Sequence, residues 1–390
     1  MKKDKSPFTA LLSVAAIAGD ILFVLWILYN GINEDFQGTT VEKFSYVTLM
    51  GLLAVNAPYL FITATVRNNP TLMRKILSLP LLIAFALMPT LVQAQTIKVT
   101  LLGTGTPLPE VDRFGPGTLV EAGGEYFLFD CGRGVSQRLW QKKIQLAKVK
   151  KIFLTHLHSD HVVGIPDFWL TGWLPMQYGQ RKEPLQIYGP SGTAKMMESL
   201  EEAYQADIEG RRPGIRADSG AMVLPKDIGE GIVWDEKGIK ITAFLVDHGR
   251  MTALGYRFDY AGHSVVISGD TKYSENLVKY AKGTDVLIHE VALARPELVE
   301  KSETTRKILS SHISPEVGGT IFSQVNPGLA VYSHILLIST DPGISPPTTD
   351  DLIPRTRVNY EGPLVIGEDL MSIEIADTVS VQNFLKDEVN

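Results

Sequence analysis

Residues 155–161 of the chain read Thr-His-Leu-His-Ser-Asp-His and directly follow an apolar stretch that ends at Leu154. Neutral imidazole and carboxylate both bind first-row metals, so three imidazoles and a carboxylate this close together are a concentration of metal ligands. His156 and His158 can reach one ion, while Asp160 and His161 can face a second ion a few ångströms away. The stretch therefore predicts a two-metal site where a strand ends.

Other candidate ligands have the same kind of placement. The chain has only 8 histidines in 390 residues. His248, Asp270 and His334 each close or follow a short β-like apolar run, and His312 lies beside a serine. Open α/β sheets place their sites at the carboxyl ends of strands. The sequence thus predicts that segments far apart in the chain contribute to one site.

Taken in order, these residues resemble the metallo-β-lactamase superfamily, and within it the ribonuclease Z and arylsulfatase-like branch. Further matches are Leu-Gly-Thr-Gly-Thr-Pro at residues 102–107, Phe-Asp-Cys-Gly at residues 129–132 and Ser-His-Ile-Ser at residues 311–314. The resemblance covers residues 97 to about 375. It implies an α/β fold, a four-layer αβ/βα sandwich with the metals at one edge between two sheets. It is much less specific for the substrate.

The resemblance also implies two zinc ions, each bound by three side chains and sharing one carboxylate. The ligands of the first ion would be His156, His158 and His248. The ligands of the second would be Asp160, His161 and His334, with Asp270 bridging the pair. The alternatives are core histidines at positions 248 and 334 and a helix cap at position 270. Manganese or iron accepts the same ligands, so the sequence leaves the metal open.

The implied chemistry is hydrolysis by a hydroxide shared between the ions, because zinc lowers the pKa of bound water to about 7. Asp160 would orient this hydroxide. His312 is the candidate proton donor, since the resembling ribonucleases have His-Ser-Thr in this place; a structural role is its alternative. His289 and Glu290 are expected to end a buried strand and to orient ligands by hydrogen bonds. Cys131, the only cysteine, is expected to be a core thiol.

The first 95 residues are of another kind. Residues 1–70 contain two apolar runs, 8–29 and 46–66, that predict transmembrane helices. Residues 71–95 predict a signal peptide or a third membrane segment. Loop charges place the amino-terminal tail in the cytoplasm, so we expect the hydrolase domain, residues 96–390, in the periplasm, either anchored to the inner membrane or secreted. The alternative is that residues 1–70 are a misjudged start or a fused small membrane protein.

The charge of the chain bears on the substrate. The formal net charge is −6, and an acidic domain is a poor partner for a polyanion. Ribonucleases Z of the bacterial type carry a long arm between the ligands that match His248 and Asp270, which here are only 22 residues apart. Residues 167–174 and 207–212 instead resemble insertions of the arylsulfatase-like members and are expected to border the site mouth.

These arguments favour an exported dinuclear zinc hydrolase of small anionic esters, with aryl sulfates first and phosphodiesters second, and they argue against nucleic acid as a partner. One alternative is a β-lactamase or lactonase. A second is a ribonuclease Z-type endonuclease that processes the 3′ ends of tRNA, and a third is a membrane-tethered binding protein with an inactive site. The sequence leaves the oligomeric state open.

Periodicity indicates how the domain is organised. Helices are expected at residues 135–141, 192–206, 274–281 and 315–324, within two β-rich halves that span residues 97–204 and 232–375. Phe168, Trp169 and Trp173 are spaced as on an amphipathic helix. They are expected either to pack in the core or to reach the cleft.

Overall fold

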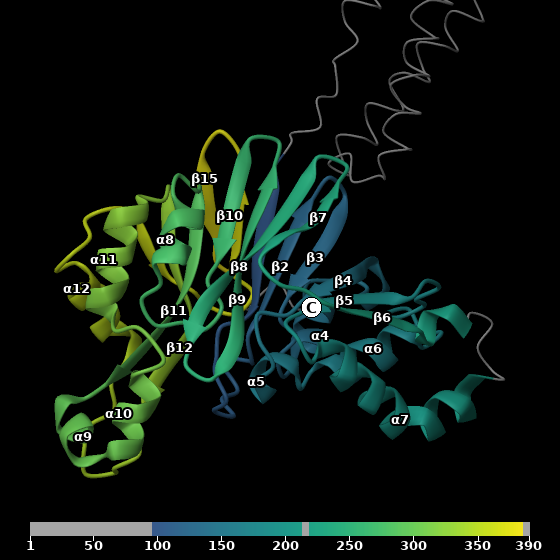
Figure 1. Ribbon diagram of the computed structural model, residues 1–390, viewed down its shortest axis with the longest axis horizontal. Helices are drawn as coiled ribbons and strands as arrows, with labels where there is room; N and C mark the ends of the chain where they lie inside the picture. The colour runs from purple at the N-terminus through teal and green to yellow at the C-terminus, as the bar shows by residue number, and fades with distance from the viewer. Residues whose placement is uncertain (1–95, 213–217, 385–390) are drawn as a thin grey trace, which may run out of the picture. The chain divides into compact units, whose positions relative to one another are not determined.

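The computed structural model describes residues 96–212 and 218–384, which form two sheets packed face to face (Figure 1). The first sheet has the order β15-β14-β1-β2-β3-β4-β5-β6. Its strands are β1 (Ile97–Gly103), β2 (Gly117–Ala122), β3 (Glu125–Phe129), β4 (Val149–Phe153), β5 (Leu185–Gly189), β6 (Val223–Asp227), β14 (Ser372–Ile375) and β15 (Val379–Gln382). The second has the order β13-β12-β11-β10-β9-β8-β7. Its strands are β7 (Gly231–Glu236), β8 (Ile239–His248), β9 (Met251–Tyr260), β10 (His263–Ile267), β11 (Val286–Ala294), β12 (Leu329–Ile338) and β13 (Leu364–Ile366).

Helices cover the outer face of each sheet. The helices of the first sheet are α4 (Val135–Gln141), α6 (Ile165–Trp173) and α7 (Thr193–Arg211), and those of the second are α8 (Glu275–Ala281), α11 (Pro315–Val325) and α12 (Leu352–Thr356). Three short helices are α5 (Ser159–Val162), α9 (Pro296–Lys301) and α10 (Glu303–Leu309). This arrangement confirms the four-layer αβ/βα sandwich.

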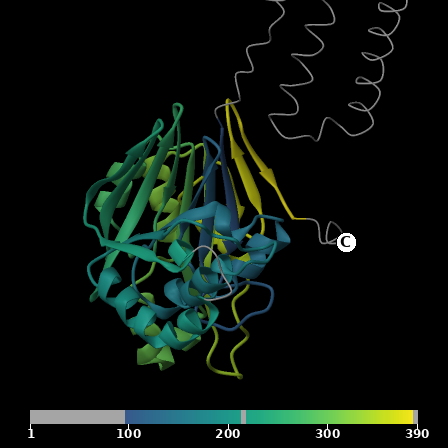
Figure 2. The same cartoon turned by 90° about the vertical axis from the view of Figure 1, so that its right-hand side faces the viewer.

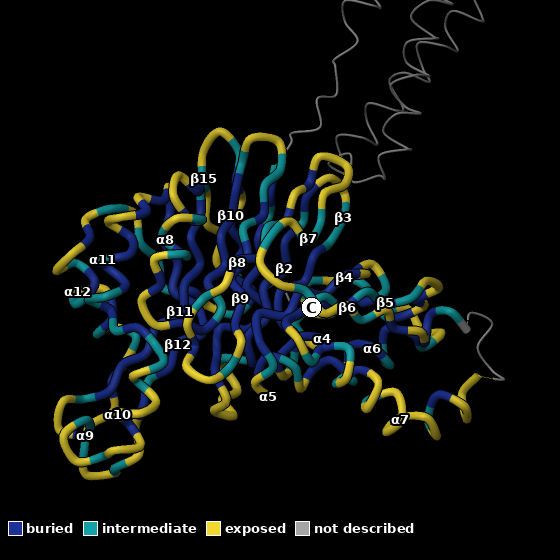
Figure 3. Tube along the Cα trace, viewed as in Figure 1, coloured by how far each residue is buried: buried dark blue, intermediate teal, exposed yellow. Residues whose placement is uncertain are grey.

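Three apolar layers hold the sandwich together. The central layer joins the inner faces of both sheets and includes Phe127, Phe153 and Phe258. Two outer layers join each sheet to its helices. Every residue of β11 is buried, as expected for a parallel strand covered on both faces. The strands form the buried centre, while α7, α9 and α10 have largely exposed surfaces (Figure 3).

One strand pair departs from the expected halves. The last strands, β14 and β15, belong to the first sheet, although they follow the second sheet in sequence. β14 pairs antiparallel with β1, with Ile375 opposite Ile97 (Figure 2). This pairing satisfies backbone groups along the other side of β1, which the expected halves would have left as an exposed edge.

All four expected helices are present. α4 has the predicted bounds, and α8 and α11 differ from them by one residue at one end. The hydroxyl of Ser274 accepts a hydrogen bond from the backbone N–H of Leu277 and so caps α8. α7 continues five residues beyond the expected end, to Arg211. Phe168, Trp169 and Trp173, all on α6, are buried in the core and do not reach the cleft.

Residues 1–95 lie outside the described residues. Both predicted transmembrane helices and the signal-like segment fall there, so anchoring and export stay predictions. Within residues 96–212 and 218–384, no helix is both long enough and apolar enough to cross a membrane.

Candidate metal centre

The candidate ligands meet at one edge of the sandwich, where several strands end. The loop after β4 carries His156 and His158, and α5 follows with Asp160 and His161 in its single turn. His248 is the last residue of β8, and Asp270 follows β10. His334 lies within β12. The structure thus brings all seven predicted ligands together from segments up to 178 residues apart.

The first group contains His156, His158, His248 and Asp270, and it could hold one metal ion. His158 Nδ1 lies 2.9 Å from His156 Nε2 and 3.2 Å from His248 Nε2. Asp270 Oδ2 lies 3.8 Å from His156 Nε2 and 3.7 Å from His248 Nε2. Burial keeps the pKa of His156 well below its usual range, so the imidazole is neutral, as a ligand must be.

The second group contains Asp160, His161 and His334, and it could hold a second ion. Asp160 Oδ2 lies 3.2 Å from His334 Nε2 and 3.5 Å from His161 Nε2. The Asp270 carboxylate lies between the groups, with Oδ1 3.4 Å from His161 Nε2 and Oδ2 3.4 Å from His334 Nε2. A carboxylate that bridges two metal ions would have to lie here, between the two groups of ligands.

A backbone irregularity aims His334 at the centre. The register between β11 and β12 shifts between His289 and Val291, so β12 has one extra residue at this point. His334 has a φ of 45°, in the left-handed region that side chains other than glycine seldom adopt. A bulge of this kind redirects a side chain out of the alternating pattern.

The residues present fit divalent metal ions. His161 Nε2 and Asp270 Oδ1 are buried and have no hydrogen-bond partner among the described residues. Buried polar atoms without partners are rare in proteins, and here they point toward one another as ligand atoms would. Burial opposes a charge on His161, but the carboxylates of Asp270 and Asp130 outweigh it and raise the pKa of His161. The surroundings therefore favour a positive charge, which a metal ion supplies.

Comparison with known proteins agrees with this geometry. The family pattern described as "Beta-lactamase superfamily domain" matches residues 125–335, which contain all seven candidate ligands. The chain belongs to the β-lactamase superfamily. It is 34% identical to Ribonuclease Z of Mycolicibacterium gilvum (strain PYR-GCK) over 284 residues, which are 72% of this chain and 96% of that protein. It is 35% identical to Ribonuclease Z of Mycobacterium sp. (strain KMS) over 292 residues, 73% of this chain and 99% of that protein.

Solved structures share the superfamily fold. The metallo-β-lactamase fold protein YhfI from Bacillus subtilis is 18% identical, with a TM-score of 0.56 over 72% of this chain and 100% of that one. The short form of human tRNase Z is 22% identical, with a TM-score of 0.52 over 71% of this chain and 98% of that one. At these identities the likeness concerns the fold alone.

The relatives overturn one expectation. The preference for small anionic esters over nucleic acid is wrong, because relatives that share about a third of their residues with this chain over nearly their full length are ribonucleases. The physical reason is that net charge is a sum over the whole domain. Binding to a polyanion depends on the few cations that line the cleft, and these can be present in an acidic domain.

Asp130, part of the Phe-Asp-Cys-Gly motif at residues 129–132, contacts a candidate ligand from behind. Its carboxylate Oδ2 lies 2.8 Å from His161 Nδ1 and accepts a hydrogen bond of 2.8 Å from the Thr155 hydroxyl. Oδ1 accepts a hydrogen bond of 2.7 Å from the Thr155 backbone N–H. An Nδ1 proton on His161, held by Asp130, leaves Nε2 free to bind a metal.

We expect Asp130→Asn to weaken zinc binding by about 10- to 100-fold, the usual effect of losing an acceptor behind a ligand histidine. The asparagine keeps the shape but loses the charge that favours the Nδ1 proton of His161. Competition with a zinc-binding dye measures the change. Asp167→Asn is the matched control, since the Asp167 carboxylate contacts Thr171 on α6. Equal zinc affinity of Asp130→Asn and the wild type would contradict the assigned role.

Glu290 and His312 form a second pair beside the centre. His312 Nδ1 lies 3.3 Å from Glu290 Oε2, an ion-pair contact without the alignment of a hydrogen bond. Glu290 Oε1 accepts a hydrogen bond from the backbone N–H of Ile313, which fixes the segment that carries His312. Burial disfavours the charged imidazole, but Glu290 outweighs it and raises the pKa of His312 to about 9. Glu290 thus favours the protonated form of His312, which lines the cleft over the centre.

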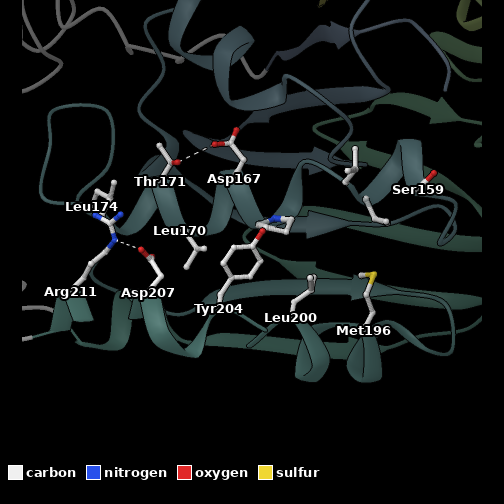
Figure 4. A pocket seen from close by; sticks show the side chains of 13 residues that line it. Ser159, Asp167, Leu170, Thr171, Leu174, Met196, Leu200, Tyr204, Asp207 and Arg211 are labelled. Carbon is white, nitrogen blue, oxygen red and sulfur yellow. Dashed lines mark hydrogen bonds and ion pairs between the residues drawn. The ribbon is translucent and has the colours of Figure 1, made fainter. Parts of the chain in front are cut away.

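The predicted segments 167–174 and 207–212 contribute to a groove that shares only Ser159 with the cleft over the centre, so their place at the site mouth stays a prediction. A groove of about 720 Å³ lies between α6 and α7, with Ser159 at one end and Arg211 at the other (Figure 4). Leu170, Leu200 and Tyr204 make its walls largely apolar. Arg211 Nε lies 2.7 Å from Asp207 Oδ1, so its charge is already paired within α7.

Proposed function

We propose that the protein is a metal-dependent endonuclease of the ribonuclease Z type, which hydrolyses a phosphodiester bond in RNA. The observation that carries this proposal is the likeness to ribonucleases Z over 96–99% of their length. The family pattern, which matches residues 125–335, includes both candidate metal groups and the His312 segment. The precursor of a tRNA with a 3′ extension is the substrate to test first.

The side chains support phosphodiester hydrolysis in distinct roles. Two divalent ions bound by the seven candidate ligands would provide activated water and positive charge to stabilise the transition state. Asp160 lines the cleft and would orient the attacking water by a hydrogen bond. When the phosphorus–oxygen bond breaks, the leaving oxygen needs a proton. His312 lines the same cleft and has a raised pKa, which supports a role as the proton donor.

The test uses the purified full-length protein with its metal content measured. We expect it to cleave a precursor tRNA at one site near the mature 3′ end, to lose this activity with a chelator, and to regain it when zinc or manganese is added. Nitrocefin, a lactam substrate, and bis(4-nitrophenyl) phosphate are assayed in parallel. Intact RNA together with rapid lactam hydrolysis would contradict the proposal and favour the lactamase alternative.

A further inference from the structure

The cleft above the candidate metal centre has two lobes that share His158, His248 and His312. One lobe, of about 470 Å³, is lined by candidate ligands and by apolar side chains such as Leu108 and Leu336, and it contains no Arg or Lys. The other, of about 500 Å³, is lined by Arg250, Met251, Thr304, Lys307, Ile308 and Ser311 in addition to the shared histidines. The two lobes therefore lead away from the same centre but differ in charge.

Arg250 and Lys307 are the charged residues of the second lobe. Apart from His312 and the candidate ligands, they are also the only charged residues among the described residues that line either lobe. Both are exposed, and among the described residues neither charged group has an ion pair or a hydrogen bond. Asp247, the acidic residue nearest to Arg250 in sequence, is paired with Lys272 at 3.0 Å. The second lobe is thus a local concentration of free positive charge.

The backbone holds the two cations at the same lobe from different elements. Arg250 lies in the turn between β8 and β9, directly after Gly249, whose φ of 68° suits glycine. Lys307 lies on α10, one residue before Ile308, which lines both lobes. Guanidinium binds two phosphate oxygens at once, whereas ammonium acts as a point charge. Together they suit one phosphate group of a chain.

We propose that Arg250 and Lys307 bind a phosphate of the RNA backbone next to the scissile phosphodiester, so that the RNA leaves the metal centre through the second lobe. This inference rests on the proposed function and adds the direction in which the RNA chain leaves the metal centre. Phosphate contacts fix the register of a nucleic acid without reading its sequence. A small diester has no neighbouring phosphate and cannot use the two cations.

The test compares the full-length wild type with the double variant Arg250→Ala/Lys307→Ala, each loaded with zinc. Fluorescence anisotropy measures the affinity for a labelled precursor tRNA at several salt concentrations. The same RNA is used to measure cleavage. Turnover of bis(4-nitrophenyl) phosphate measures hydrolysis of a small diester. The matched control, Lys240→Ala/Lys282→Ala, removes two exposed charges away from the lobes. We expect the double variant to reduce the slope of log affinity against log salt by about 0.7, the value for one single-strand phosphate contact, with unchanged diester turnover.

The outcomes separate this inference from the proposed function. RNA that binds equally well to the wild type and the double variant overturns the phosphate contact, even if RNA is cleaved. RNA binding that needs Arg250 and Lys307 but leads to no cleavage supports the contact and overturns the proposed function. If no RNA binds to the wild type, both are wrong. An equal loss in the control variant would also overturn the contact, because the effect would then come from net charge alone.

Discussion

Asp270→Asn is expected to lower RNA cleavage by about a thousandfold or more and to reduce bound zinc from two ions per chain to at most one. Asp270 contacts His156, His248, His161 and His334 through one buried carboxylate. Burial would raise the pKa of Asp270, but the surrounding imidazoles outweigh it and hold the pKa well below its usual range. The metal ions stabilise the transition state by several kcal/mol, and losing this stabilisation lowers the cleavage rate by about a thousandfold.

Zinc content and thermal unfolding test this expectation without relying on activity. Zinc that binds only the folded wild type raises its melting temperature, and the increase should be much smaller in Asp270→Asn. Asp259→Asn is the matched control, since Asp259 lies on β9 and pairs with Arg257 at 2.9 Å. A variant that keeps two zinc ions and a normal zinc-induced increase would show that Asp270 does not bridge the groups.

His312→Gln is expected to lower kcat for RNA by about 10²- to 10⁴-fold, the usual contribution of general acid catalysis, while zinc content stays unchanged. The ribose oxygen released from RNA needs a proton, whereas nitrophenolate leaves without one. Turnover of bis(4-nitrophenyl) phosphate should therefore change little. A parallel loss on both substrates would contradict proton donation and favour a structural role for His312.

The pH dependence provides a second test of the same residue. Only the protonated imidazole can donate, so wild-type cleavage of RNA should fall as the pH rises through the pKa of His312. Glu290→Gln removes the carboxylate that raises this pKa, so the fall should begin at lower pH. The glutamine oxygen can still accept the hydrogen bond from Ile313, which keeps the segment in place. An unchanged profile in Glu290→Gln would mean that another group is the acid.

Most candidate ligands could be predicted from the sequence because they follow or end a strand, and strand ends gather at one edge of a sheet. His334 is the exception, since β12 continues beyond it to Ile338 and a bulge turns its side chain toward the centre. The role of Asp130 could not be predicted from local patterns. It depends on a left-handed backbone conformation, with φ of 59°, and on a contact with His161, which lies 31 residues further along the chain. The order of ligands is a local signal, while the orientation of a ligand depends on the tertiary structure.

Two other features also depend on long-range structure. β14 has only four residues, too few for its sequence pattern to assign it to a sheet. It joins the first sheet because its backbone pairs with β1. The substrate expectation failed because net charge does not reveal where charges lie. Arg250 and Lys307 are 57 residues apart in sequence and line the same lobe only in the folded domain.

The pairing of β1 with β14 also determines when folding can finish. β1 is made early, but its partner on one side is not available until residues 372–375 have been synthesised. Asp369, which accepts hydrogen bonds from the backbone of Thr104 and Phe114 in the loops after β1, becomes available equally late. Contacts between such distant residues slow folding, because the entropy of closing a long loop must be overcome first. We therefore expect the domain to reach its catalytic form after translation, in a late step that joins its two ends.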